Sequence, residues 1–206
     1  MTATTTAFTY VQLAAQVYLY PPMIGQLNSA GRAIVSTTED GRVITFRGSD
    51  DIASWLHDFE AVTQPVTGLG DVHAGFWSAW LEIAIPCLNV QPQVLAGHSL
   101  GAALAIIAAA NLCLEGKPPK AVYAFEPPRV STDSAIHQLL LDNGVELYLF
   151  RNGRDVVTQI PMALPDWPWY PLPLIGIGEQ GEFFDNVEDH AILEVVQAVQ
   201  VWVASK

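Results

Sequence analysis

The sequence predicts an α/β fold in which a mostly parallel central sheet is covered by helices on both faces. Strand-like and helix-like segments alternate along the chain, which is the order of a parallel sheet with crossover helices. Residues 83–114 carry no charge, as expected of a helix buried against such a sheet. Near the start, β-rich segments at 33–37 and 42–46 flank an Asp-Gly turn, which predicts an antiparallel hairpin.

Each element has its own signal. The apolar pattern from Phe8 to Tyr18 suits an amphipathic helix that ends at Pro21 and Pro22. After the hairpin we expect a helix at 72–83, a strand at 93–96, a helix at 99–114, a strand at 121–125, a helix at 135–141, a strand at 145–150 and a helix at 190–203. The length of 206 residues without an internal repeat suits a single domain over residues 1–206.

The composition is acidic and apolar together. Lys and Arg number 9 against 21 Asp and Glu, which gives a formal net charge of −12. So few basic residues, in no cluster, argue against a nucleic-acid partner. Charged residues make up 15% of the chain, against about 25% in typical globular domains, and hydrophobic residues make up 50%. The high apolar content excludes intrinsic disorder.

The apolar segments are not expected to enter a membrane. The run at 100–110 is too short, because a spanning helix needs about 20 apolar residues. No basic segment precedes the N-terminal apolar stretch, and Gln12 and Gln16 interrupt it, so no signal peptide is expected. Cys87 and Cys113 form no disulfide framework and are expected to be inert buried thiols. We therefore expect a cytoplasmic protein without stable membrane insertion, whose oligomeric state is unknown.

The segment Gly97-His98-Ser99-Leu100-Gly101 is the most informative one for chemistry. It has the pattern G-x-S-x-G, follows an expected strand and opens a helix rich in small residues. Glycines on both sides let the chain reverse sharply around the serine, so that its hydroxyl projects from the sheet edge. Ser99 is therefore a candidate nucleophile; the alternative is a serine that only caps the helix.

A serine nucleophile needs a base, and the chain has five histidines. His98 sits inside the turn, so its side chain points away from the hydroxyl, and His137 lies mid-helix with a packing or surface role. His190 precedes the last helix and lies downstream of every expected strand. That position suits a fold in which serine, acid and histidine follow in chain order. The alternative for His190 is a surface residue at a helix N-terminus.

The acid that orients the base is expected between the serine and His190, just beyond a strand end. Asp155 fits, because it closely follows the strand expected at 145–150. Asp166 and Asp185 are rivals, but neither follows a strand closely. A salt bridge to a neighbouring arginine is the alternative role for Asp155.

Beyond these residues, the chain resembles the class 3 lipases, the fungal triacylglycerol lipase type of the α/β-hydrolases. The resemblance covers roughly residues 5–203 and consists of five motifs in family order: 45-TFRGSDDIASWLHDF-59, 73-HAGFW-77, 97-GHSLGAALA-105, 124-AFEPPRV-130 and 151-RNGRDVVTQIP-161. It implies an α/β-hydrolase fold.

The resemblance also implies roles for individual residues. Ser99 would be the nucleophile, Asp155 the acid and His190 the base, in agreement with the reading of the residues themselves. The resemblance adds an oxyanion hole, built from the backbone N–H groups of Ser49 and Leu100. Two such donors facing the developing negative charge are what acyl transfer requires.

The sequence departs from the family pattern at several points. Glu126-Pro127-Pro128 stands where the family has a glycine, which changes a close backbone contact. The export signal and disulfides of the fungal enzymes are missing. The lid-like segment at 49–58 is short and acidic, with Ile52, Trp55 and Leu56 as its apolar residues. Such a lid is expected to favour soluble or short-chain esters over emulsified fat.

A Pro/Trp-rich loop at 161–177 connects the segments of the acid and the base, and it carries almost no charge. We expect it to line the site and to bind the acyl chain of the substrate, together with Trp55 from the lid-like segment. The contributing residues would be Trp167, Trp169, Tyr170, Leu172 and Leu174; the alternative is that they pack as ordinary core.

These observations predict a serine carboxylic ester hydrolase, a lipase or esterase, that acts through an acyl-enzyme on short- to medium-chain or soluble esters. No cofactor and no metal are expected, since the sequence has no H-E-x-x-H motif or Cys/His cluster. An acyltransferase or a phospholipase using the same site is an alternative within enzymes. A non-catalytic binding module on a hydrolase fold is an alternative outside them.

Overall fold

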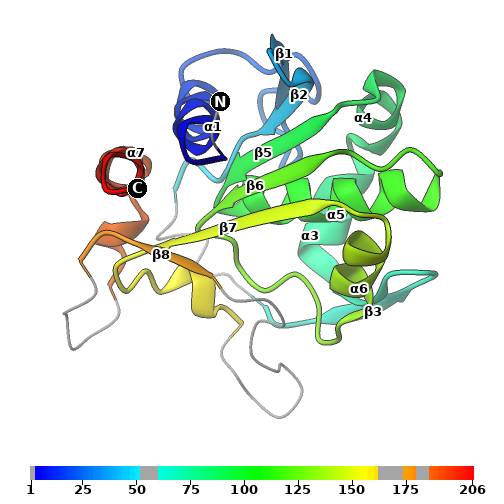
Figure 1. Ribbon diagram of the computed structural model, residues 1–206. Helices are drawn as coiled ribbons and strands as arrows, with labels where there is room; N and C mark the ends of the chain where they lie inside the picture. The colour runs from blue at the N-terminus through cyan, green and yellow to red at the C-terminus, as the bar shows by residue number, and fades with distance from the viewer. Residues whose placement is uncertain (1–2, 52–59, 162–173, 180–185) are drawn as a thin grey trace.

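A six-stranded sheet forms the centre of the computed structural model, which describes residues 3–51, 60–161, 174–179 and 186–206 (Figure 1). The strand order is β1-β2-β5-β6-β7-β8. β1 and β2 pair antiparallel, and every later pair is parallel. The strands are β1 (Ala33–Thr38), β2 (Gly41–Phe46), β5 (Val94–His98), β6 (Ala121–Phe125), β7 (Glu146–Asn152) and β8 (Ile175–Ile177). The predicted mostly parallel sheet is confirmed.

Helices cover both faces of this sheet, as predicted (Figure 1). On one face, α1 (Ala3–Gln16) and α7 (Ile192–Ala204) lie side by side. The other face carries α3 (Ala74–Leu81), α4 (Ala84–Val90), α5 (Leu100–Leu114) and α6 (Ala135–Asp142). There are also two single-turn 3₁₀ helices among the described residues. The first, η1 (Val157–Gln159), follows the carboxyl end of β7, and the second, η2 (Glu188–His190), directly precedes α7.

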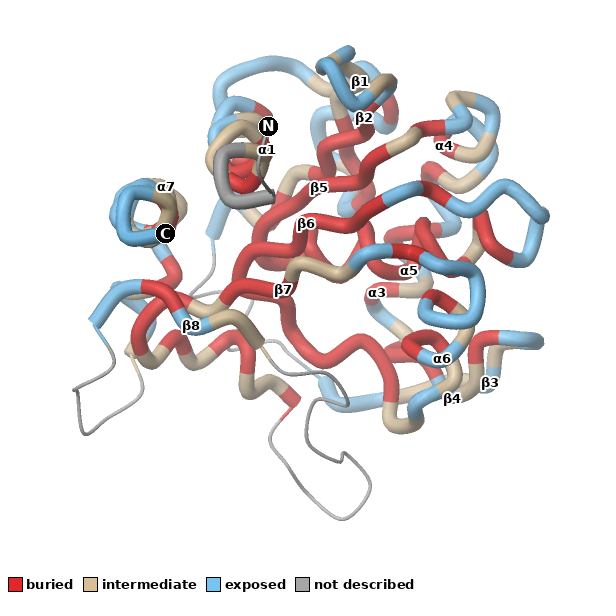
Figure 2. The backbone as a smooth tube through the Cα atoms, viewed as in Figure 1, coloured by how far each residue is buried: buried red, intermediate tan, exposed pale blue. Residues whose placement is uncertain are grey.

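The sheet separates two hydrophobic cores, because successive strand residues point to opposite faces. Along β6, Val122 and Ala124 join the core under α5, while Tyr123 and Phe125 join the core under α1 and α7. Tyr123 stacks on Tyr10 of α1 with ring centroids 4.3 Å apart. Figure 2 shows the resulting buried band along the central strands, with exposed residues on the outer sides of the helices.

Some elements differ from the expectation. The helix expected at 72–83 begins only at Ala74, and the residues before it form a second, two-stranded sheet of β3 (Thr63–Val66) and β4 (Gly70–His73). A left-handed glycine, Gly70 with φ 75°, opens β4. α4 and β8 were not expected, and α1 ends at Gln16, several residues before the Pro-Pro pair.

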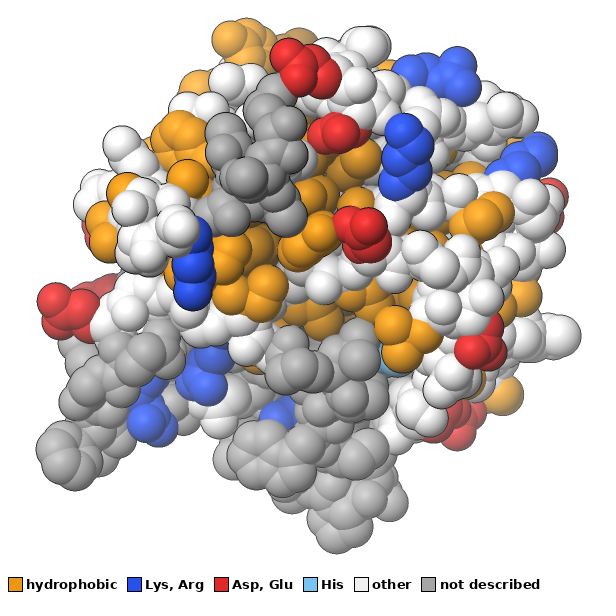
Figure 3. Space-filling model, in the orientation of Figure 1, with side chains coloured by type: hydrophobic (Ala, Val, Ile, Leu, Met, Phe, Trp, Pro, Cys, Tyr) orange, Lys and Arg blue, Asp and Glu red, His pale blue; other side chains and the backbone are white. Residues whose placement is uncertain are grey.

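The apolar excess is partly buried and partly at the surface. Thirteen of the residues of α5 are buried, whereas Leu19, Met23 and Leu27 between α1 and β1 expose more than half of their surface. Figure 3 shows hydrophobic side chains between scattered charges across the middle of the face drawn. Among the described residues, no helix has the length and apolar character needed to cross a membrane.

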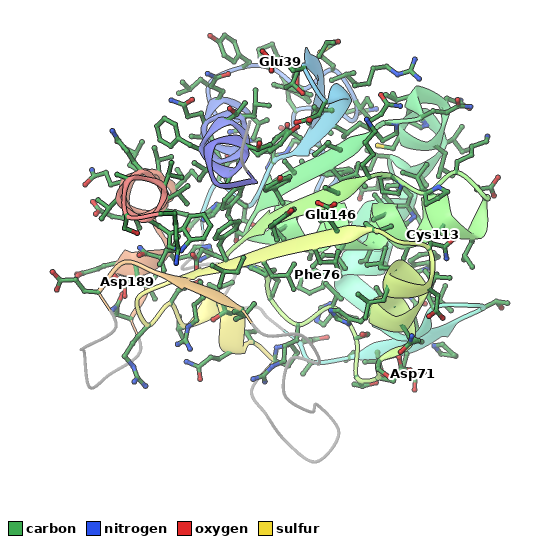
Figure 4. The ribbon with its side chains drawn as sticks, in the orientation of Figure 1. Glu39, Asp71, Phe76, Cys113, Glu146 and Asp189 are labelled. Atoms are coloured by element: carbon green, nitrogen blue, oxygen red, sulfur yellow. The ribbon has the colours of Figure 1, made fainter. Side chains whose placement is uncertain are left out.

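Both cysteines are buried and unpaired, as predicted. Burial raises the pKa of Cys87 to about 12 and that of Cys113, which lies near the end of α5 in Figure 4, to about 11. Thiols with such pKa values stay protonated at neutral pH and are poor nucleophiles.

Candidate active site

Ser99 occupies the turn between β5 and α5. It is the residue between the last residue of β5 and the first of α5, and its backbone has φ 58° and ψ −128°. A positive φ is unfavourable for a residue with a side chain, and such strain concentrates at functional sites. The N–H of Ser99 donates to the carbonyl of Phe125 at 3.0 Å, which ties the turn to the end of β6.

Three glycines allow the backbone to pack closely around this turn. A Cβ on Gly97 would lie 2.2 Å from the carbonyl oxygen of Gly101, and a Cβ on Gly101 would lie 2.3 Å from that of Phe46. A Cβ on Gly48 would lie 2.7 Å from the carbonyl oxygen of His98. The glycines therefore bring the segment after β2 against the serine turn.

Asp155 and His190 meet at the carboxyl end of the sheet. His190 Nδ1 lies 2.9 Å from Asp155 Oδ2, and both side chains are buried. Because the carboxylate can only accept, Nδ1 carries the proton and neutral His190 has its free lone pair on Nε2. His190 Nε2 and Ser99 Oγ are both buried without a hydrogen-bond partner among the described residues. A base and a hydroxyl are thus left with unused hydrogen-bonding capacity.

The carboxyl group of Asp155 is held in its ionised form. Burial by itself would raise its pKa, but the bond with His190, the neighbouring Glu126 carboxyl and the N–H of Val157 hold the pKa below its usual value. The Val157 N–H donates to Asp155 Oδ1 at 3.0 Å. An ionised Asp155 can stabilise a positive charge that forms on His190.

The loop of the base is fastened to the loop of the acid. Asp189, labelled in Figure 4 beside β8, accepts the N–H of Arg154 at 2.9 Å through its carboxylate. The backbone carbonyl of Asp189 accepts the side-chain N–H of Asn152 at 2.9 Å. Asn186 pairs with Asp155 in a short parallel bridge. These contacts fix the residue before His190 and therefore the place of the imidazole.

His98 is hydrogen-bonded to the backbone of His190. Its Nε2 lies 2.9 Å from the backbone carbonyl of His190, so this nitrogen carries the proton, and its Nδ1 then accepts from the hydroxyl of Tyr18 at 3.0 Å. Burial lowers the pKa of His98 to about 3, so the ring stays neutral. Both ring nitrogens of His98 are thus engaged by Tyr18 and by the backbone of His190.

We expect Tyr18→Phe to lower the free energy of unfolding by about 1–3 kcal/mol, because the buried Nδ1 of His98 loses its donor. Ester hydrolysis should fall with it, since His98 holds the backbone of His190. Urea unfolding followed by fluorescence measures the first effect. Tyr20→Phe is the matched control, because Tyr20 is 59% exposed. Equal stability changes in the two variants would contradict the prediction.

The other histidines are engaged elsewhere. His73 caps α3: its Nδ1 accepts the N–H of Phe76 at 3.3 Å, and its Nε2 donates to the carbonyl of Glu60 at 2.8 Å. His137 of α6 is buried, and burial lowers its pKa to about 4. His57 lies outside the described residues. His190 is thus the histidine in the described ranges that faces the acid.

Ser49 and Leu100 line one cavity of about 360 Å³, together with His73, Phe76 and Ala79. Leu100 is the first residue of α5, and the N–H groups of a first helical turn have no partner within the helix. Asp50, also in this cavity, is paired with Arg32 at 2.8 Å and with Arg47. Both residues proposed for the oxyanion hole therefore border the same space.

Several expected residues lie outside the described part of the chain. The lid-like segment is described only at 49–51, and the Pro/Trp-rich loop only at 161 and 174–177. Leu174 is partly buried and packs against the core under α5. The residues outside are the expected substrate contacts Trp55, Trp167, Trp169, Tyr170 and Leu172, and the rival acids Asp166 and Asp185.

Glu126 is the residue at this site that sequence reasoning noticed but did not place. It is fully buried. A carboxylate oxygen of Glu126, one of Asp155 and a ring nitrogen of His190 all lie within 4.8 Å of one another. Three such atoms could in principle hold a cation, but His190 Nδ1 is already bonded to Asp155. We therefore interpret the group as a hydrogen-bonded network. The signal in the sequence that could have indicated this role is the glutamate at position 126, where the family pattern has a glycine.

Comparison with known proteins identifies the family. A family model described as Lipase (class 3) matches residues 43–164. Secreted mono- and diacylglycerol lipase A from Penicillium cyclopium is 32% identical over 149 residues, which cover 66% of this chain and 48% of that protein. Secreted mono- and diacylglycerol lipase 1 from Fusarium solani is 33% identical over 135 residues, which cover 58% of this chain and 39% of that protein. The chain thus spans half or less of the length of these relatives.

The solved structure of lipase II from Rhizopus niveus has the same fold, with a TM-score of 0.72 and 20% identity over 92% of this chain and 94% of that one. The expectation of a cytoplasmic location is wrong, because the curated relatives are secreted proteins. Cysteine content and the first residues were misleading signals of location. The family model covers more than half of the chain, and the chain therefore belongs to the class 3 lipase family.

Proposed function

We propose that this protein is a carboxylic ester hydrolase that uses Ser99, His190 and Asp155 as a catalytic triad. The observation that carries the proposal is the bond between His190 Nδ1 and Asp155 Oδ2, which leaves His190 Nε2 buried and without a partner among the described residues, as Ser99 Oγ also is. Membership of the class 3 lipases agrees with it.

In the proposed reaction, Ser99 Oγ attacks the ester carbonyl while His190 Nε2 takes the hydroxyl proton. Asp155 stabilises the imidazolium that forms. His190 then gives its proton to the oxygen of the leaving alcohol, and the acyl group stays on Ser99. Water, deprotonated by His190, attacks the acyl-enzyme; the bond between the acyl carbon and Ser99 Oγ then breaks, His190 returns the proton to Oγ, and the acid is released. Every proton is returned, so the triad ends as it began.

The negative oxygen of the tetrahedral intermediate is proposed to bind the N–H groups of Ser49 and Leu100. Their position at one cavity supports this role, and the close approach at Gly48 brings the two backbone segments together. One such donor typically contributes about 10²–10³ in rate. The N-terminus of α5 adds a partial positive charge at the same point.

The proposed substrates are short- to medium-chain or soluble esters, including partial glycerides of the kind that the relatives' names mention. The cavity of about 360 Å³ is small for a ligand pocket, since such pockets span roughly 300–1,000 Å³. Its lining includes Arg32 and Asp50 beside apolar Phe76 and Ala79, which suits a substrate with a polar end. The net charge of −12 disfavours anionic lipid surfaces.

Labelling with a fluorophosphonate tests the reaction class, and a p-nitrophenyl ester series from acetate to palmitate tests the substrate. We expect one adduct, mapped by mass spectrometry to Ser99, and hydrolysis that declines toward palmitate. Absence of an adduct on Ser99 contradicts the proposal that the protein is a serine ester hydrolase. An adduct combined with activity that rises up to palmitate contradicts only the proposed chain length.

A further inference from the structure

Glu126 lies at the end of β6, directly beside the proposed triad. Its side chain is fully buried, and its backbone has φ 53°, a left-handed conformation that favours glycine. One carboxyl oxygen, Oε1, accepts the N–H of Asn152 at 2.7 Å. This bond ties Glu126 to the last residue of β7, three residues before Asp155.

The second oxygen of Glu126, Oε2, is buried and has no donor among the described residues. Asp155 is close to it, since ligand atoms of Glu126, Asp155 and His190 all lie within 4.8 Å of one another. Two buried carboxylates this close repel each other unless one of them carries a proton, and a protonated carboxyl can donate that proton in a hydrogen bond to the other. Asp155 already accepts from His190 and Val157, whereas within the described ranges Glu126 accepts from Asn152 alone, which assigns the proton to Glu126.

The surrounding charges agree with this assignment. Burial, together with the bond to Asp155 and the charge of Asp155, raises the pKa of Glu126 well above its usual value. The N–H of Asn152 and the charge of Arg151 in β7 act in the opposite direction but are weaker. On the side of η2, the facing groups are His190 and, behind it, neutral His98.

We propose that Glu126 is a positioning residue of the triad, whose protonated carboxyl donates a hydrogen bond to Asp155 and thereby limits how strongly Asp155 holds a proton on His190. This inference rests on the function proposed above. The donated bond spreads the negative charge of Asp155 over a larger group. His190 then loses its proton more readily, and the base is free at lower pH than with an isolated aspartate.

The backbone conformation of Glu126 also supports a positioning role. The family resemblance places a glycine at this step, and glycine adopts a positive φ without strain. Glutamate at φ 53° brings strain and a buried acid into the site at the same time. A residue with only a packing role would need neither the acid nor the strained conformation.

Two variants separate the roles of the carboxyl. Glu126→Gln keeps the shape, accepts from Asn152 and donates from its amide to Asp155. Glu126→Gly removes the donor but suits the backbone, so the variant is expected to fold. We measure kcat/KM against pH for a p-nitrophenyl ester, and we compare wild type with Glu126→Gln in the infrared at neutral pH for the carbonyl band of a protonated carboxyl.

We expect the acid limb of the pH profile to stay in place in Glu126→Gln and to move up by about one pH unit in Glu126→Gly. The wild type should show a protonated-carboxyl band that both variants lack. A shift of the acid limb to lower pH in Glu126→Gln would mean that Glu126 is ionised, and it overturns the proposal. Unchanged acid limbs in both variants overturn it too, because the residue is then only structural.

The same experiments distinguish failure of the proposed ester hydrolase function from failure of the proposed role of Glu126. If wild type neither hydrolyses esters nor labels at Ser99, the enzyme assignment fails. The infrared difference does not depend on turnover. An absent carbonyl band therefore contradicts the proposed protonation of Glu126 even in an inactive protein. An active wild type with a labelled Ser99 and no effect of Glu126 leaves the function standing and removes only this inference.

Discussion

Replacing Ser99 with alanine should lower kcat for ester hydrolysis by about a million-fold, while KM changes little. The variant lacks the only atom proposed to form the acyl-enzyme, and the residual rate would come from the oxyanion donors and from substrate binding. Because Ser99 Oγ has no hydrogen-bond partner among the described residues, its removal breaks no bond that stabilises the fold. Steady-state kinetics on a p-nitrophenyl ester measures the change.

Ser36→Ala is the matched control. Ser36 in β1 also has a buried hydroxyl without a partner in the described ranges, but it lies on an outer strand of the sheet. Both variants should unfold at about the same temperature as wild type, and Ser36→Ala should keep its activity. Substantial hydrolysis by Ser99→Ala would show that another nucleophile is at work.

Replacing Asp155 with asparagine should lower kcat by about 10⁴-fold, although the side chains have the same shape. The amide can donate to His190 Nδ1, which moves the imidazole proton to Nε2, the nitrogen proposed to act as the base. A protonated Nε2 cannot accept the proton of Ser99. The variant also loses the negative charge that stabilises the imidazolium. Single-turnover kinetics with a chromogenic ester separates this loss from product release.

Asp133→Asn provides the comparison for Asp155→Asn. The carboxyl of Asp133 also accepts backbone N–H groups, those of Asp71 at 2.9 Å and Ala135 at 2.9 Å, but it belongs to the loop before α6. We expect its activity to stay within about twofold of wild type, because Asp133 has none of the hydrogen bonds described above for Ser99, Asp155 and His190. Equal losses in the two variants would indicate a general effect of removing a carboxylate.

The central residues of the proposed site have signals that can be read from the sequence. Glycines around Ser99 are a signal within five residues, and the structure shows the clashes that any larger side chain would produce there. Asp155 and His190 were reached from chain order and strand ends, and the structure joins them by a hydrogen bond. The proximity of Glu126 to Asp155 depends on how β6 and β7 pair, which no local pattern shows.

The missed elements are those whose signals are weak or mixed. β3 contains Pro65, and proline argues against a strand except at an edge. α4 is a single apolar stretch with Pro86 in its first turn, where the missing N–H does no harm. β8 has only three residues and pairs with the end of β7 alone. Tertiary pairing decides such short elements.

The alanine-rich composition of α5 has a consequence for the entropy of the reaction. Six of its fifteen residues are alanine, which loses no rotamer freedom on burial and has the highest helix propensity. The helix can therefore be packed rigidly between the sheet and α3 and α6 without a large loss of side-chain freedom. The N–H group of Leu100, the proposed oxyanion donor, then points in one direction before any substrate arrives, so that in the proposed reaction little ordering remains when charge develops on the carbonyl oxygen.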